Sequence, residues 1–150
     1  MYLAATEDLA TREIVGWSMA DHLRADLCTD ALVMALQRRR PEPGLIHHSD
    51  RGAQHAAEPH RRVLGRHGIQ QSMSRRGNCL DDAPMESFFA SLKTGHVHHV
   101  RFRTRAEAKA AVFDYVEVFY NRQRLHSALG YRTPAEARAS MEGITMLRAA

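Results

Sequence analysis

Two stretches decide the fold class: Leu45-Ile46-His47-His48-Ser49-Asp50 and Asp82-Ala83-Pro84-Met85-Glu86-Ser87-Phe88-Phe89. The first is a short apolar strand that runs into a polar segment, so Asp50 is expected at the carboxyl end of that strand, where α/β sheets tend to place ligands. The second predicts a helix from Asp82 to Lys93 with Pro84 in its first turn. A strand-end carboxylate and a helix carboxylate, Asp50 and Glu86, with 35 residues between them, can converge on a hard cation such as Mg²⁺.

The segments on either side predict the rest of an α/β chain. Upstream, two short apolar runs separated by a polar turn predict a hairpin, followed by an amphipathic helix that Pro41 ends. Helix starts with capping-box spacing precede the C-terminal third. The expected elements are a hairpin of Tyr2–Thr6 and Glu13–Met19, a helix over Ala25–Arg40, a strand over Leu45–His48, a helix around Glu58–Gly65, a strand over Ile69–Met73, a helix over Asp82–Lys93, and helices that start at Thr104 and Thr133. This order predicts a mixed sheet flanked by helices, with a helical C-terminal part.

Buried faces follow from the spacing of apolar residues. Within the second strand of the hairpin, alternation places Val15, Trp17 and Met19 on one face. The helical stripes are expected to be Leu27, Ala31, Leu32 and Ala35; Met85, Phe88, Phe89 and Leu92; and Ala108, Ala111, Val112, Tyr115 and Phe119. Glu86 lies at the margin of its stripe. The aromatic residues Phe88, Phe89, Tyr115 and Phe119 are therefore expected in the core rather than as stacking platforms for bases.

Charge is distributed unevenly along the chain. Residues 36–76 carry nine basic and three acidic side chains, and residues 91–140 carry nine and four. Between them, residues 77–90 have no basic side chain but contain Asp81, Asp82 and Glu86. Basic flanks around an acidic segment are typical of a surface that binds a polyanion around a cation site. From charge alone, an ordinary solvated surface is an equal alternative.

Length and composition narrow the class of protein. The 150 residues suit one domain, expected over residues 1–140 with a tail over residues 141–150. No apolar run approaches the roughly 20 residues needed to span a bilayer, and the start lacks a signal peptide, so a cytoplasmic protein is expected. Its two cysteines, Cys28 and Cys79, form no CxxC pair. The histidine-rich segment His96–His99 lacks partners for structural zinc.

Several short sequence motifs resemble those of a known family. Residues 47–55, His47-His48-Ser49-Asp50-Arg51-Gly52-Ala53-Gln54-His55, and residues 77–89, which include Glu86, resemble the second-Asp and Glu motifs of insertion-sequence transposases of the DDE class. Residues 8–17 and residues 120–134 are similar to the same family in the same order. These transposases have a catalytic core of the retroviral-integrase type, in the ribonuclease-H-like superfamily. The resemblance covers about residues 2–140.

The resemblance implies a chemistry. An Asp–Asp–Glu set in this family holds two divalent ions, Mg²⁺ or Mn²⁺; water cleaves the transposon end, and the freed 3′-hydroxyl attacks target DNA. Asp50 corresponds to the second carboxylate and Glu86 to the third. Double-stranded DNA is the implied partner, with a homo-oligomer and a companion helix-turn-helix subunit. The candidate phosphate contacts are Arg75, Arg76, Lys93, Arg122, Arg124 and Arg132.

The first carboxylate of the family has no counterpart among these residues. It lies on a strand upstream of the segment that Tyr2-Leu3-Ala4-Ala5 resembles, so we expect an N-terminally truncated core that lacks its first strand. Asp8, Asp21 and Asp81 do not lie where they could replace it. Because that carboxylate bridges both metals, the 150 residues as written are expected neither to cleave nor to join DNA. The alternative function is a DNA-binding, oligomerising remnant without catalysis.

Overall fold

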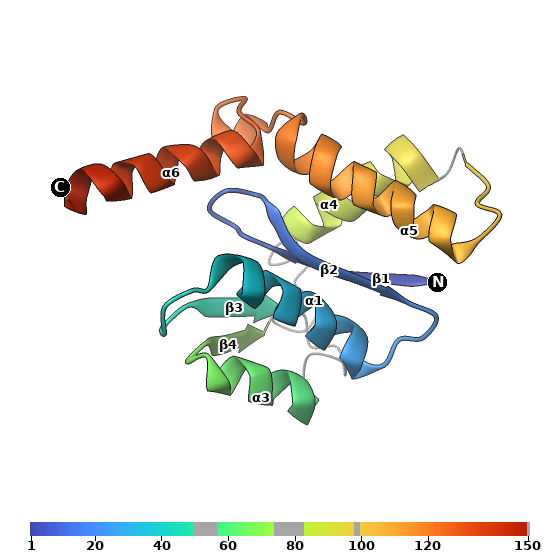
Figure 1. Ribbon diagram of the computed structural model, residues 1–150, viewed down its shortest axis with the longest axis horizontal. Coiled ribbons are helices and arrows are strands. Elements are labelled where there is room, and N and C mark those ends of the chain that lie inside the picture. The colour runs from blue at the N-terminus through green and yellow to red at the C-terminus, as the bar shows by residue number, and fades with distance from the viewer. Residues whose placement is uncertain (50–56, 74–82, 98–99, 150) are drawn as a thin grey trace. The chain divides into compact units, whose positions relative to one another are not determined.

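The computed structural model describes residues 1–49, 57–73, 83–97 and 100–149, and shows an α/β chain, as the sequence predicted (Figure 1). The chain divides into two compact units. The first consists of Met1–Thr6 and Val15–Phe89, and the second of Glu7–Ile14 and Ala90–Ala150. Each unit is considered by itself below.

The chain opens with the predicted hairpin. Strand β1 covers Tyr2–Glu7, strand β2 covers Ile14–Ala20, and the two are neighbours in one sheet. The connection is too short for a crossover, so the strands run antiparallel. The turn is closed by two backbone hydrogen bonds: the N–H of Asp8 donates to the carbonyl of Glu13 (2.9 Å), and that of Arg12 donates to the carbonyl of Asp8 (2.6 Å).

Strand β2 packs closely against helix α1, which covers Ala25–Arg39. The contact is made at Gly16, where a Cβ atom would lie 2.1 Å from the carbonyl oxygen of Ala31 and 2.9 Å from the Cβ of Ala35. The absence of a side chain therefore sets the distance between strand and helix. The predicted stripe of α1 is confirmed, because Leu27, Ala31, Leu32 and Ala35 are all buried.

The second sheet is parallel. Strand β3 covers Ile46–Ser49 and strand β4 covers Gln70–Met73, with Ile46 opposite Gln70 and Ser49 opposite Met73. Helix α3, Glu58–Arg66, connects the two strands, as parallel pairing requires. Helices α1 and α3 pack together over an apolar cluster of Leu32, Leu36, Leu64 and Ile69, with Val63 at its edge. The strands of the described ranges form two two-stranded sheets, β1–β2 and β3–β4.

Helix α4 covers Ala83–Leu92, with Pro84 in its first turn as predicted. Phe88 and Leu92 are buried, whereas Phe89 is only partly covered. The chain then continues into a π-helical turn, η2, over Lys93–Val97. The predicted helix end at Lys93 is therefore one residue beyond the end of the α-helix.

The second unit is mostly helical. Helix α5 covers Arg105–Phe113 and widens into a π-helical segment, η3, over Asp114–Tyr120. One prediction was wrong: Phe119 is 42% exposed rather than buried. The physical reason is the change of period, because a π-helix bonds residue i to residue i+5, and Val116 and Tyr120 take the buried positions instead.

Both predicted helix starts are capped by a threonine; the reciprocal capping box is complete at Thr133, whereas the Glu107 carboxylate accepts the N–H of Arg103 (2.8 Å) rather than that of Thr104. The Thr104 hydroxyl accepts the N–H of Glu107 (3.1 Å), and the Thr133 hydroxyl accepts that of Glu136 (3.2 Å), whose carboxylate in turn accepts the N–H of Thr133 (3.1 Å). A 3₁₀ turn, η4, covers Ser127–Leu129.

The last helix, α6, covers Pro134–Ala149 and passes the boundary expected at residue 140. The division into a core over residues 1–140 and a tail over residues 141–150 stays a prediction. Within the described ranges, no helix is long and apolar enough to cross a membrane.

Candidate functional site

The candidate site begins at the carboxyl end of β3. Its last residue, Ser49, is buried and lies opposite Met73 of β4. The strand starts and ends one residue later than the sequence indicated, so Asp50 follows it directly in the chain. Asp50 itself, like Arg75 and Arg76, lies outside the described residues, so its predicted role stays a prediction.

The two residues before Ser49 fix the strand on its neighbours. The Nδ1 atom of His48 lies 3.1 Å from the hydroxyl of Ser72 on β4. The ring of His47 lies 5.4 Å from the ring of His60, a buried residue of α3. These contacts connect β3 to its sheet partner β4 and to helix α3.

The second predicted carboxylate, Glu86, lies in the first turns of α4. Its side chain is exposed, whereas Phe88 and Leu92 of the same helix are buried. This arrangement anchors the helix through its apolar face and leaves the carboxylate open to a ligand. In the ranges that the structure describes, no three His, Cys, Asp or Glu side chains are arranged to hold a metal ion.

The predicted phosphate contacts have different environments. Lys93, Arg122 and Arg132 are exposed, whereas Arg124 is half-buried. The Arg124 guanidinium lies over the ring of Tyr120, 5.3 Å from its centre. Arg124 therefore supports the packing of its own unit, and its role as a DNA contact stays a prediction.

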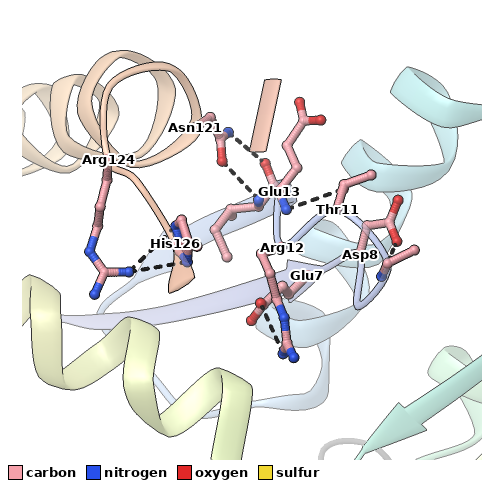
Figure 2. A network of polar contacts seen from close by, with 10 residues as sticks. Glu7, Asp8, Thr11, Arg12, Glu13, Asn121, Arg124 and His126 are labelled. Atoms are coloured by element: carbon pink, nitrogen blue, oxygen red, sulfur yellow. Dashed lines mark hydrogen bonds and ion pairs between the residues drawn. The ribbon is translucent and has the colours of Figure 1, made fainter. Parts of the chain in front are cut away.

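A buried carboxylate that the sequence analysis missed lies in the second unit (Figure 2). The side chain of Glu7, the last residue of β1, is only 1% exposed and lies 4.0 Å from the guanidinium of Arg12. Neither carboxylate oxygen has a hydrogen-bond partner within the described residues. The signal available in the sequence was a single acidic residue at the end of an otherwise apolar strand.

The network around Glu7 shifts the pKa values of its members. Burial raises the pKa of Glu7 from 4.5 to about 7, against the positive charges of Arg12 and Arg124, which lower it. Burial, together with the positive charges of Arg124 and Arg12, lowers the pKa of His126 to about 4. Burial and the nearby Glu7 carboxylate raise the pKa of Tyr120. At neutral pH the imidazole is therefore uncharged, whereas Glu7 titrates near this pH.

Within the segment of residues 120–134, the side chain of Asn121 forms hydrogen bonds with the backbone of Ile14. Its amide oxygen accepts the N–H of Ile14 (2.9 Å), and its amide nitrogen donates to the carbonyl of Ile14 (3.0 Å) (Figure 2). Both residues are buried, so the side chain of Asn121 pairs with β2 in the way that a further strand would. The residues from Tyr120 onward thus have a structural role beside any role in binding.

The comparisons with known proteins agree with the resemblance. Two family models, both described as integrase core domain, match residues 1–79 and residues 86–140. The uncharacterized 31 kDa protein of insertion element IS600 from Shigella sonnei is 49% identical over 138 residues, which cover 92% of this chain and 51% of that protein. The transposase of insertion sequence IS904 from Lactococcus lactis is 42% identical over 136 residues, which cover 91% of this chain and 54% of that protein.

A solved structure supports the fold. A chain of the simian T-cell lymphotropic virus intasome, determined in complex with a PP2A regulatory subunit, matches with a TM-score of 0.69 at 13% identity. The match covers 90% of this chain and 47% of that one. The expected ribonuclease-H-like α/β fold is confirmed by this likeness. The chain spans about half the length of the curated relatives it matches.

Proposed function

Since the chain belongs to the integrase core domain family, we propose that its 150 residues supply part of the DNA-processing core of an insertion-sequence transposase. The observation that carries the proposal is the exposed carboxylate of Glu86 on a helix anchored by Phe88 and Leu92. It is supported by strand β3, which leads directly into Asp50. The cytoplasm is the proposed location of the protein.

Asp50 and Glu86 would hold the divalent ions of the family. The donor chemistry fits, because Mg²⁺ and Mn²⁺ prefer carboxylate oxygens and Glu86 is open to solvent. Two bound ions would stabilise the attacking and leaving oxygens of a phosphodiester. The contribution of the chain is to present Glu86 from a rigid helix and Asp50 from the end of a packed strand.

Double-stranded DNA is the proposed partner, as transposon end and as target. Lys93, Arg122 and Arg132 are exposed and would contact phosphates, and such contacts give affinity and salt dependence without reading sequence. Arg75, Arg76 and Arg124 complete the proposed set. A second copy of the chain and a companion helix-turn-helix subunit are the proposed protein partners.

We further propose that these 150 residues alone do not complete the reaction. By the resemblance they hold counterparts of two of the three family carboxylates, and a metal site with an incomplete set of ligands would lose most of its affinity. The polypeptide alone would then act as a DNA-binding, oligomerising module. Glu7 does not alter this proposal, because its carboxylate is buried rather than open to a ligand.

The experiment uses the 150-residue polypeptide with labelled duplexes that carry transposon ends. Fluorescence anisotropy is expected to show binding that weakens steeply between about 50 and 200 mM salt. A strand-transfer assay with Mg²⁺ or Mn²⁺ is expected to yield no joined product. Joined product would refute the proposed incompleteness, and absence of DNA binding at low salt would refute the proposed function.

Metal binding is tested separately from activity. Addition of Mn²⁺ is expected to broaden the NMR signals of residues around Glu86, and Glu86→Gln is expected to weaken that effect. The matched control is Glu58→Gln, which changes an exposed carboxylate of α3 in the same unit and is expected to leave the effect unchanged. Equal broadening in wild type and Glu86→Gln would remove Glu86 from the proposed site.

A further inference from the structure

The loop that precedes α6 has an unusual conformation. It consists of residues 126–133 and is called here the Tyr131 loop. Gly130 (φ 66°) and Tyr131 (φ 59°) are consecutive residues in the left-handed region. Glycine adopts this region freely, whereas a residue with a bulky side chain does so only where the surrounding structure imposes it.

Hydrogen bonds hold the loop in this conformation. The N–H of His126 donates to the carbonyl of Arg132 (3.0 Å), and the N–H of Tyr131 donates to the carbonyl of His126 (2.9 Å). Leu129 and Thr133 are buried on either side of the turn. The base of the loop is further fixed because the ring of His126 packs edge-on against Tyr120. The ring nitrogens of His126 also lie 3.4 Å from Nη1 of Arg124 (Figure 2). Backbone hydrogen bonds and buried residues therefore fix both ends of the loop.

The backbone of Tyr131 is held in this way, but its side chain is mostly exposed. Tyr131 is 73% exposed, although it sits in a backbone conformation that favours glycine. Burial therefore does not offset the conformational cost of the residue. A rigid aromatic side chain presented to solvent from a fixed backbone suits a contact with another molecule, since little conformational freedom remains to be lost on binding.

The charges around the loop indicate the kind of molecule. Residues 120–132 contain three arginines and one histidine but no acidic residue, and the Glu136 carboxylate at the end of the loop accepts the N–H of Thr133. Arg132, next to Tyr131, is exposed, and its Nε donates to the carbonyl of Leu129 (2.9 Å), which fixes the guanidinium beside the loop. A second copy of this surface would be repelled by the same charges. A polyanion that also offers flat aromatic faces, namely nucleic acid, matches both the arginine and the tyrosine.

We propose that the Tyr131 loop is a contact for DNA ends, in which the Tyr131 ring stacks on an exposed base and Arg132 contacts the adjacent phosphate. The inference rests on the proposed function and adds to it a base-stacking residue. Bases inside a continuous duplex are covered by their neighbours, so the ring can stack only on a terminal pair or an unpaired base. The loop therefore favours frayed or single-stranded ends over uninterrupted duplex.

The experiment compares wild type, Tyr131→Gly and Tyr131→Phe. Tyr131→Gly removes the ring and suits the left-handed backbone, so the thermal midpoint is expected to stay the same or rise. Tyr131→Phe keeps the ring. Affinity for a duplex with an unpaired 2-aminopurine end is measured by anisotropy, and stacking by quenching of the 2-aminopurine fluorescence. Tyr2→Gly, which removes an exposed tyrosine of β1 in the other unit, is the matched control.

Tyr131→Gly is expected to bind the frayed end on the order of 10-fold more weakly and to lose the quenching. Tyr131→Phe and Tyr2→Gly are expected to behave as wild type, and Arg132→Gln is expected to lower the slope of log affinity against log salt by about 1. Wild-type quenching and affinity in folded Tyr131→Gly would overturn the inference while leaving the proposed function standing. A change in oligomeric state without a change in DNA binding would overturn it as well. Failure of the wild type to bind any DNA would overturn the proposed function and the inference together.

Discussion

The buried carboxylate of Glu7 makes the stability of the protein depend on pH in a predictable way. Its pKa is about 7 in the folded state, compared with 4.5 for an exposed glutamate, and burial is the main cause of the rise. Between pH 4.5 and about 7 the folded state therefore binds the proton that the unfolded state has lost. Unfolding then releases a proton, so the stability contributed by this group is fully present below pH 4.5 and is lost as the pH rises through about 7.

The magnitude follows from the size of the shift. Each pKa unit corresponds to about 1.4 kcal/mol, so a rise from 4.5 to about 7 corresponds to a cost of about 3 kcal/mol once Glu7 is fully ionised. The side chain is only 1% exposed, so screening by solvent reduces this figure little. The ion pair with Arg12 at 4.0 Å offsets part of the burial cost and is already contained in the shift.

The perturbation is Glu7→Gln, which keeps the shape of the side chain and removes its charge. Urea unfolding at several pH values is expected to show similar free energies of unfolding for variant and wild type at the acidic end. Near pH 8 the variant is expected to be more stable than wild type by about 3 kcal/mol. Glu58→Gln, which alters a carboxylate that is 74% exposed, serves as control and is expected to change the stability by less than about 0.5 kcal/mol at every pH. Parallel pH profiles for wild type and Glu7→Gln would refute the reasoning.

Three further predictions follow from the packing and the hydrogen bonds. Gly16→Ala is expected to destabilise the fold by about 3 kcal/mol, because the added Cβ would lie 2.1 Å from a carbonyl oxygen of α1. Gly65→Ala, where the added Cβ would meet open space on α3, is expected to stabilise the fold by about 0.5–1 kcal/mol. Thermal melts of the two variants check both expectations. Asn121→Ala is expected to cost about 3 kcal/mol in chemical unfolding, because it leaves both backbone groups of Ile14 without their partner. His126→Gln is expected to reduce the loss of stability on acidification from pH 6.5 towards 4, because only the unfolded state gains a proton there; equal slopes in acid titrations of unfolding would contradict this.

Local periodicity was sufficient to predict most of the fold. The stripe of α1, the hairpin and both threonine caps depend on neighbours within a few residues, and the structure confirms them. The buried position of Phe119 was predicted wrongly because the change from α- to π-helical spacing at Asp114 has no signal in a pattern that assumes a constant period. Gly16 could be placed on the strand, but its close approach to Ala31 depends on how α1 packs against it.

The candidate site was predictable to a different degree. The strand before Asp50 and the helix that carries Glu86 were found, because each has a local sequence signal. Glu7 was missed because the sequence gives no sign of its burial, and Arg124, whose charge lowers its pKa, lies more than a hundred positions away. The same separation hides the pairing of Asn121 with Ile14, where an ordinary polar side chain takes the place of a strand. A sequence motif identifies the residues that a family shares, but it does not say whether those residues bind a partner or stabilise the fold.

Glu7 and His126 belong to one network and titrate in overlapping ranges with opposite effects on stability (Figure 2). As the pH rises from 4.5 to 6.5, the cost of ionising Glu7 increases while the cost of keeping His126 uncharged decreases. The two slopes oppose each other, so the wild-type profile is flatter than that of either single variant. A flat profile for the wild type therefore does not show that the two groups have ordinary pKa values. The difference between each variant and the wild type carries that information, and the double variant Glu7→Gln/His126→Gln is expected to be flat for a different reason, since it has lost both groups.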